Sequence, residues 1–244
     1  KNKLSIRGVY GLFPAQSVDE TIRIFQDESR LLSSTELIFL RQQMKKGDNE
    51  PYYCLSDFIS PLNSGVKDWL GAFAVMVGPE VAEICAQYET DHDDYSAIMI
   101  KALADRLAEA FAEKLHEEIR TKIWGYAKNE SLSQEELIKE KYSGIRPAPG
   151  YPACPDHTDK NKLFNLLEVE KNIGLELTEN YAMNPASAVC GWYFSHPQSK
   201  YFSTGKINKD QIVSVSKTKG WTTEQTEKWL SPNLAYKPQQ KEKV

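Results

Sequence analysis

The pattern of hydrophobic and polar positions divides the chain into short strands and helices in uneven alternation. The most regular stretch is 95–119, where apolar side chains recur every three or four residues, as on one face of an α-helix. We expect two helices between Pro79 and Trp124, meeting near the acidic sequence at 91–94. The apolar positions of the predicted buried face are Tyr95, Ile98, Met99, Ala102, Leu103, Leu107, Ala110, Phe111, Leu115 and Ile119.

Before these helices the chain is rich in β-branched and aromatic residues, which predicts mainly strands. Residues 14–19 are expected to form a turn, and one helix is expected at about 35–46, closed by Gly47. A second turn is expected through Pro61, Asn63 and Gly65. The expected strands are 6–13, 22–26, 52–59 and 70–77.

After Trp124 the pattern mixes both kinds of element. Ser133 and Glu136 have the spacing of a capping box, which predicts a short helix ending near Lys141. Further helices are expected at 158–172, closed by Gly174, at 208–220 and at 223–230. Strands are expected at 175–183, 188–195 and 199–207, the last two paired across residues 196–198.

Hairpin-connected strands with separately grouped helices are typical of an α+β fold. We therefore expect a twisted, largely antiparallel sheet with grouped helices, and not a Rossmann fold. No Gly-rich turn follows a strand, since Gly8 and Gly11 lie inside one, and no GxxxxGK[ST] phosphate loop is present.

Composition narrows the classes of function. The chain is 41% hydrophobic and 26% charged, as in ordinary globular proteins. Its net charge is -4, whereas a nucleic-acid surface would need a basic stripe, so we expect no nucleic acid as a partner. No apolar run reaches the ~18 residues of a membrane span, so we expect no membrane partner. The chain begins without Met or an apolar signal region, which suggests a cytoplasmic piece of something longer.

The four cysteines are scattered without a CxxC pair, as in a reduced protein. Cys154 and His157 have the spacing of metal ligands, but a zinc site would need a second such pair, and none is present. We therefore expect no metal and interpret Cys154 as a small thiol in a Pro-rich loop.

That loop, at 144–157, is the most unusual stretch of the chain. Its four prolines make it stiff, and Gly150 allows a turn or a close approach to a ligand. A rigid loop presents the Arg146 guanidinium and its own backbone groups at little cost in ordering. Taken alone, the same composition also fits a structural turn that wraps a helix N-terminus.

The sequence RPAPGYPACPDHT at 146–158 resembles the signature of the activation domain of cobalamin-dependent methionine synthase. The resemblance implies that residues 1–244 are one such domain. That family has a longer N-terminal portion, with an Asp-Trp-Thr-Pro-Phe-type segment that gives the ligand an acidic contact, and we expect it to be missing here. Similar stretches follow the family in order: PYYCLSDF (51–58), HDDYSAIMIKALADRLAEAFAE (92–113), GWYFSHPQSKYF (191–202) and WLSPNLAY (229–236).

The resemblance implies a domain that binds S-adenosylmethionine and presents its methyl group to reduced cobalamin. Arg146 would hold the ligand carboxylate bidentately, while Tyr151 and Tyr201 would offer π faces. For Tyr201 and Phe202, packing along a strand is an equal alternative. The implied S-adenosylmethionine-binding residues are Arg146, Ala148, Gly150, Tyr151, Tyr201, Phe202 and Glu109.

Asp105, Glu109, Glu113 and Glu117 share one helix face because they recur every four residues. We interpret Glu113 and Glu117 as solvated. The resemblance implies that Asp105, together with His157 in the loop, faces a partner domain. The remaining histidines at 92, 116 and 196 have no convergent partners in the sequence, as is common for surface or core residues.

Methyl transfer to cobalamin requires no general acid or base from this domain, so we expect no catalytic residue. Cobalamin would act only through a partner domain, because the DxHxxG pattern that ligates it is absent. The resemblance also implies a flavodoxin or diflavin reductase as electron donor, and we expect a monomer. Two alternatives are a free-standing S-adenosylmethionine methyltransferase and a scaffold that docks the cobalamin domain and reductase without binding ligand.

Overall fold

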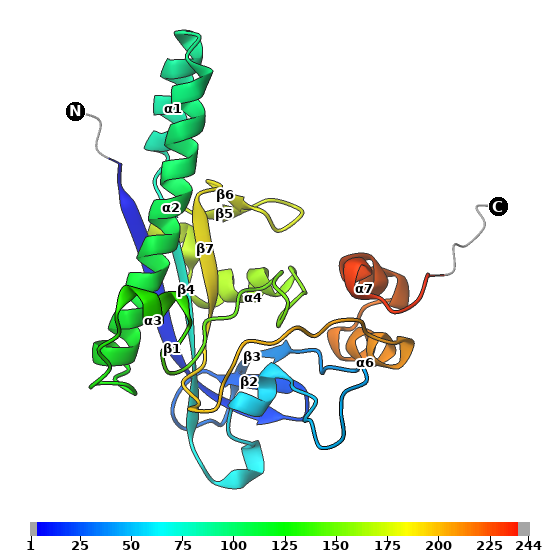
Figure 1. The fold of residues 1–244 in the computed structure, drawn as a ribbon. Coiled ribbons are helices and arrows are strands. Elements are labelled where there is room, and N and C mark those ends of the chain that lie inside the picture. The colour runs from blue at the N-terminus through cyan, green and yellow to red at the C-terminus, as the bar shows by residue number, and fades with distance from the viewer. Residues whose placement is uncertain (1–3, 239–244) are drawn as a thin grey trace, which may run out of the picture. The chain divides into compact units, whose positions relative to one another are not determined.

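The computed structural model describes residues 4–238, and the chain divides into two compact units. Unit 1 holds the described residues as far as Leu12 together with 71–146 and 160–197. Unit 2 holds 13–70, 147–159 and the described residues from 198 onward. Two long strands, β1 (Ile6–Val18) and β4 (Asp68–Val77), contribute residues to both units. They belong to a five-stranded sheet of order β3-β2-β1-β4-β7 (Figure 1).

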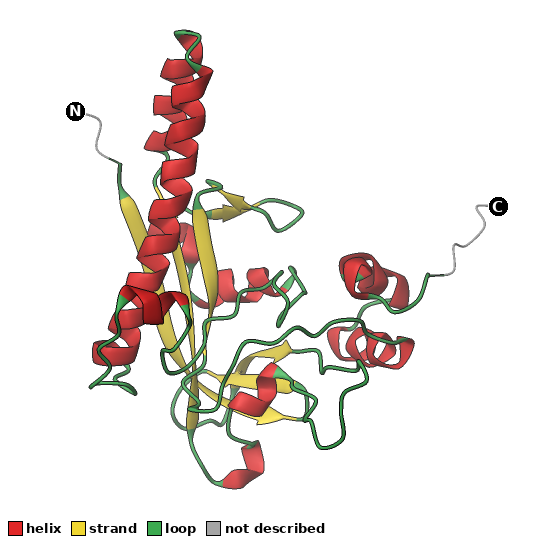
Figure 2. Cartoon of the chain, viewed as in Figure 1, coloured by secondary structure: helices red, strands yellow, loops and turns green. Residues whose placement is uncertain are grey.

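In unit 1, β4 pairs with β7 (Ala188–Tyr193) in antiparallel register from Gly71 opposite Tyr193 to Met76 opposite Ala188 (Figure 2). One side of this pair packs under the helix α2 (Asp94–Glu118), with Phe73, Val75 and Tyr193 buried against it. The other elements of this part of the chain are α1 (Glu80–Thr90), the π-helix η3 (Ile119–Ile123), α3 (Gln134–Ile138), α4 (Asp159–Leu166), α5 (Val169–Ile173), β5 (Glu176–Leu177) and β6 (Met183–Asn184).

The pair α1 and α2 confirms the two helices expected between 79 and 124, and α2 begins where Asp93 accepts a hydrogen bond from Ser96 N–H at 3.0 Å. The predicted buried face is wrong over the first three turns of α2. Its large apolar side chains are exposed there, Tyr95 by 74% and Leu103 by 51%. The prediction holds for Leu115, but the other buried residues of α2 are Ala97, Ala104, Ala108, Ala112 and His116. Small side chains let α2 lie close to α1 and the sheet. Close packing therefore determines which face of α2 is buried, and hydrophobicity alone does not.

In unit 2, β2 (Thr21–Phe25) pairs antiparallel with β1 and with β3 (Ser33–Ile38). A separate core forms where α6 (Lys209–Lys219) and the segment after α7 (Thr223–Trp229) meet Leu40 and Ile207. Short 3-10 turns complete the unit, at η1 (Leu55–Phe58), η2 (Leu62–Ser64) and η4 (Ser231–Asn233). The antiparallel pairings and grouped helices confirm the α+β class.

Three expectations for unit 2 are wrong. The helix expected at 35–46 is β3 followed by extended chain, because pairing with β2 overrides local helix propensity. The turn expected at 14–19 is the second half of β1, with Ala15 opposite Ile24. The strand expected at 52–59 does not form. The stretch is irregular chain followed by η1, where Asp57 accepts a hydrogen bond from Cys54 N–H at 2.8 Å and offers the backbone a local alternative to a ladder.

The later expectations have mixed outcomes. The capping box at Ser133 is confirmed, as are α6, α7 and the strand at 188–195. The helix expected at 158–172 breaks into α4 and α5 at Glu168, whose φ is 45°. Residues 175–183 form the β5–β6 pair rather than one strand. The segment 199–207 does not form the expected strand. The strand that pairs with β7 is β4 instead.

Two neighbouring residues on α2 test which face is buried. Leu103→Ala should change the free energy of unfolding by no more than about 0.5 kcal/mol, as for other exposed positions. Ala104→Leu should lower it by about 1–3 kcal/mol, because the added methylenes overpack the contact with α1. Urea denaturation measures both values. A loss of ~2–5 kcal/mol for Leu103→Ala would restore the face predicted from the sequence.

Candidate functional site

The signature loop, residues 147–159 of unit 2, folds back on itself through backbone hydrogen bonds. Tyr151 N–H donates to Ala148 O at 3.1 Å, Cys154 N–H to Tyr151 O at 2.9 Å, and Gly150 N–H to Cys154 O at 2.7 Å. Ala148 and Gly150 are half-buried, whereas Tyr151 is 66% exposed. The structure therefore brings Ala148, Gly150 and Tyr151 together at one tight turn, with an aromatic ring in solvent.

Gly150 is required at this turn for two reasons. Its φ of 96° lies in the left-handed region, where side chains are strained, and a Cβ there would collide with the ring of His157. His157 is exposed, and its ring lies against Gly150. Among residues 4–238, no three histidine, cysteine or acidic side chains are gathered as a metal site would need.

A buried ion-pair cluster anchors the far end of the signature loop. Lys219, at the end of α6, donates to Asp156 Oδ2 at 2.5 Å and to Asp159 Oδ1 at 3.1 Å, and only 4% of its side chain is exposed. Asp156 also accepts from both the N–H and the hydroxyl of Thr158. Because a buried charge without its partner is costly, this cluster fixes the loop to α6.

The four cysteines are buried thiols. Burial raises the pKa of Cys54 to about 11 and that of Cys190 to about 12. Burial, with Asp159 and Asp156 close by, raises the pKa of Cys154 well above its usual range. These three side chains are therefore protonated at neutral pH and pack as small apolar groups.

Tyr201 and Phe202 lie in an irregular segment of unit 2 that Thr204 connects to the loop, through its N–H and Pro152 O at 2.8 Å. Phe202 packs into an aromatic group, 5.9 Å from the ring of Tyr53 and 6.4 Å from that of Phe58. Both Tyr201 and Phe202 are half-buried. Phe202 therefore has a packing role of its own, whereas a ligand-binding role for the pair stays a prediction.

Arg146 belongs to unit 1 and follows a backbone segment that is fixed to β7. Ile145 and Phe194 each donate an N–H to the carbonyl of the other at 3.0 Å. The guanidinium of Arg146 donates from Nη2 to Glu113 Oε2 at 2.5 Å and lies with Nη1 3.1 Å from His116 Nδ1. The interpretation of Glu113 as a solvated residue is wrong, since it is paired and its side chain is only 29% exposed.

His116 is completely buried between aromatic rings. Its ring stacks on that of Tyr193 at 5.1 Å between centroids and 11° between planes, and meets Tyr142 edge-on at 5.0 Å. Tyr193 in turn stacks on Phe73 at 4.6 Å. These contacts fix the plane of the imidazole.

The protonation state of His116 follows from its surroundings. Burial, reinforced by the charges of Arg120 and Arg146, lowers the pKa of His116 from 6.5 to about 2. The ring is therefore neutral at neutral pH. Because a guanidinium only donates, Nδ1 accepts from Arg146 and the proton lies on Nε2, which is 3.4 Å from the hydroxyl of Tyr126.

Sequence reasoning missed His116 and Arg120, although a signal for them exists. Both continue the row of buried alanines at 104, 108 and 112 at the same four-residue spacing. Arg120 is fully buried, donates from Nε to Glu130 Oε2 at 2.7 Å, and lies 4.7 Å over the ring of Tyr142. A polar pair on the small-residue face of a helix indicates a buried polar cluster.

The two acidic residues singled out on α2 are both exposed. Glu109 pairs with Arg106 at 2.6 Å within the helix. Asp105 accepts a hydrogen bond from the hydroxyl of Ser187 at 2.6 Å. Their contacts neither require nor prevent the predicted roles in ligand binding and partner docking, which stay predictions.

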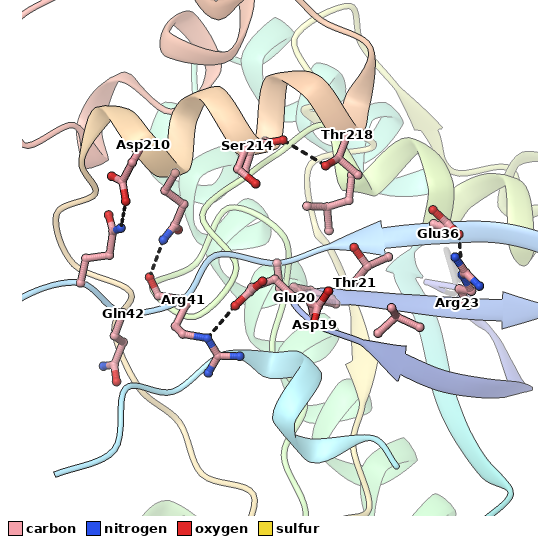
Figure 3. Close-up of a pocket in the computed structure, with 16 residues that line it drawn as sticks. Asp19, Glu20, Thr21, Arg23, Glu36, Arg41, Gln42, Asp210, Ser214 and Thr218 are labelled. Carbon is pink, nitrogen blue, oxygen red and sulfur yellow. Dashed lines mark hydrogen bonds and ion pairs between the residues drawn. The ribbon is translucent and has the colours of Figure 1, made fainter. Parts of the chain in front are cut away.

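A separate cavity of about 500 Å³ lies in unit 2 between the β2–β3 pair and α6 (Figure 3). Four of its charged side chains form ion pairs within the cavity, Arg23 with Glu36 and Arg41 with Glu20, each at 2.8 Å. None of the predicted site residues lines this cavity. In the described part of the chain, no helix combines the length and apolarity needed to cross a membrane.

Comparisons with known proteins identify the family of the chain. The family described as "Vitamin B12 dependent methionine synthase, activation domain" matches residues 1–220. Among solved structures, the crystal structure of the MetH reactivation domain bound to AdoHcy is similar to this chain with a TM-score of 0.93 and 53% sequence identity. The likeness covers 96% of this chain and 72% of that chain. These findings confirm the resemblance found at residues 146–158.

The buried neutral state of His116 predicts a pH dependence of stability. Its pKa is lower in the folded chain than in the unfolded chain, so its contribution is present above pH ~6.5 and is lost as pH falls toward 2. Below pH ~6.5 it should lower the free energy of unfolding by up to about 1.4 kcal/mol per pH unit. Urea denaturation at several pH values should show this slope reduced in His116→Gln.

The exposed His92 provides the matched control, since His92→Gln also removes one histidine. If wild type and His116→Gln showed parallel pH profiles, His116 would not be buried as a neutral ring.

Proposed function

Because the chain belongs to the family of vitamin B12 dependent methionine synthase activation domains, we propose that it binds S-adenosylmethionine and presents the methyl group to reduced cobalamin. The cobalamin would be carried by a partner domain of the same enzyme. The observation that carries the proposal is the 53% identity with a reactivation domain bound to AdoHcy. AdoHcy is what remains of S-adenosylmethionine after the methyl group has left, so a pocket for one accommodates most of the other.

Arg146 is the residue best suited to the ligand carboxylate. Its guanidinium is 22% exposed, already oriented by neighbours, and able to bind a carboxylate through parallel hydrogen bonds. We propose that the backbone around Ala148 and Gly150 contacts the adenine edge and that the exposed ring of Tyr151 faces the adenine or the sulfonium. Tyr201, Phe202 and Glu109 complete the proposed set of ligand-binding residues.

Bound reduced cobalamin would supply the nucleophile that takes the methyl group from the sulfonium. The task of this chain is then to orient S-adenosylmethionine and to exclude water, with no residue acting as acid or base. We propose Asp105 and His157, both exposed, as contacts to the partner domain. A flavodoxin or diflavin reductase would supply the electron, and the domain would act as a monomer in the cytoplasm.

Replacement of Arg146 tests the ligand site directly. Arg146→Ala should weaken binding of S-adenosylmethionine by roughly 1.5–3 kcal/mol, about 10- to 150-fold in the dissociation constant, because a charge-assisted contact is lost. Isothermal titration calorimetry of the full chain measures this change. Arg23→Ala, which removes a half-exposed arginine in unit 2 far from the predicted set in sequence, serves as control. An unchanged constant for Arg146→Ala would remove Arg146 from the site, and no binding by the wild type would favour the scaffold alternative.

The chain alone should not turn over substrate. Incubated with S-adenosylmethionine and small methyl acceptors, it should produce no S-adenosylhomocysteine above the uncatalysed background, because cobalamin is supplied by the partner domain. Chromatographic quantification of S-adenosylhomocysteine measures the product. Sustained formation with an added small acceptor would instead identify a free-standing methyltransferase.

A further inference from the structure

We propose that Glu113 and His116 are positioning residues that hold the guanidinium of Arg146 in the orientation needed for the ligand carboxylate. The proposal rests on the proposed function, since it takes the carboxylate of S-adenosylmethionine as the group that Arg146 binds. Neither residue would touch the ligand. Each would act through Arg146.

The geometry around Arg146 fixes the guanidinium in its plane. Glu113 accepts from Nη2 at 2.5 Å and His116 from Nη1 at 3.1 Å, so each terminal nitrogen of the guanidinium has its own acceptor. The ring of Tyr142 lies 5.5 Å from the guanidinium carbon, within the range of a cation–π contact. A planar fork held in this way loses little further freedom when a carboxylate binds to it.

The two acceptors are themselves rigid. They lie one turn apart on α2, whose neighbouring turn is buried against the sheet at Ala112 and Leu115. The plane of the His116 ring is fixed by stacking on Tyr193, and its Nδ1 lies toward Arg146. Because the pKa of His116 is about 2, the ring stays neutral and remains an acceptor throughout the neutral pH range.

The backbone next to Arg146 is fixed as well. Gly144 has a φ of 81°, and a Cβ there would lie 2.7 Å from the hydroxyl of Tyr126. Ile145 is then held by its reciprocal hydrogen bonds to Phe194. Both the backbone next to Arg146 and its guanidinium are therefore constrained, as expected of a preorganised binding group.

A competing account makes the opposite prediction. If Glu113 only neutralised Arg146, its carboxylate would repel the incoming ligand carboxylate, and removing that charge would strengthen binding. If Glu113 orients Arg146, removing its side chain weakens binding. The sign of the change therefore separates the two accounts.

The test uses two ligands that differ in the amino-acid part. S-adenosylhomocysteine carries the carboxylate, whereas 5′-methylthioadenosine keeps the nucleoside and thioether without it. Calorimetric titration of the full chain with both ligands should show that Glu113→Ala weakens S-adenosylhomocysteine by about tenfold, the size of one charge-assisted hydrogen bond. The affinity for 5′-methylthioadenosine should stay within about twofold, which also shows that the variant is folded.

Two further variants separate orientation from charge. Glu113→Gln removes the charge but keeps an acceptor oxygen, so it should recover most of the lost affinity. His116→Phe keeps a ring against Tyr193 but removes the acceptor, so it should weaken S-adenosylhomocysteine several-fold and spare 5′-methylthioadenosine. Glu117→Ala, one turn along α2 and paired with Lys114, is the matched control and should alter neither.

The outcomes are distinguishable. Tighter or unchanged binding of S-adenosylhomocysteine by Glu113→Ala, or an equal loss for both ligands, would overturn the positioning role while leaving the proposed function intact. A wild-type chain that bound neither ligand would overturn the proposed function, and the positioning role with it.

Discussion

The close packing of α2 determines which side chains are buried in the core of unit 1. Alanines on its buried face let the helix approach α1 and the sheet, and the same row continues into His116 and Arg120. Helix geometry therefore carries two polar side chains into the interior, where unpaired polar groups are costly. Glu130 pairs with the charge of Arg120, and Arg146 donates a hydrogen bond to the neutral imidazole of His116. The buried polar cluster around Arg146 is thus a consequence of how the helix packs, and the proposed carboxylate-binding group is part of it.

The sequence predicted elements best where one strong local signal acted alone. The capping box at Ser133 and the buried strand β4 are confirmed for that reason. Periodicity predicted the length of α2 but not its buried face, because large apolar residues and alanines form two competing stripes. At β3, cross-strand pairing with β2 overrode helix propensity, and the pattern within β3 itself does not encode its partner strand.

The candidate site was predictable only in part. The stiff loop predicted at 144–157 stood out by its prolines and Gly150, and the structure has a tight turn at Gly150. The neighbours of Arg146 could not be read from the sequence around it, because Glu113 and His116 precede Arg146 by about 30 residues and meet it only through the fold. Glu113 and Glu117 of the acidic ladder on α2 were interpreted as solvated, although Glu113 is an ion-pair partner of Arg146 in a partly buried setting. Pairings of this kind are long-range, and periodicity within one helix does not reveal them.

The burial of the cysteines has a practical consequence for experiments on this chain. Thiol reagents attack the thiolate, and the buried side chains of Cys54, Cys154 and Cys190 hold their protons at neutral pH. Cys85 is equally hidden from solvent. A cysteine introduced at an exposed position, such as Tyr151, would therefore react with a maleimide dye far faster than the native thiols. Fluorescent or spin labels can be placed on the signature loop without first removing any native cysteine, so the surroundings of the loop can be followed in the full chain.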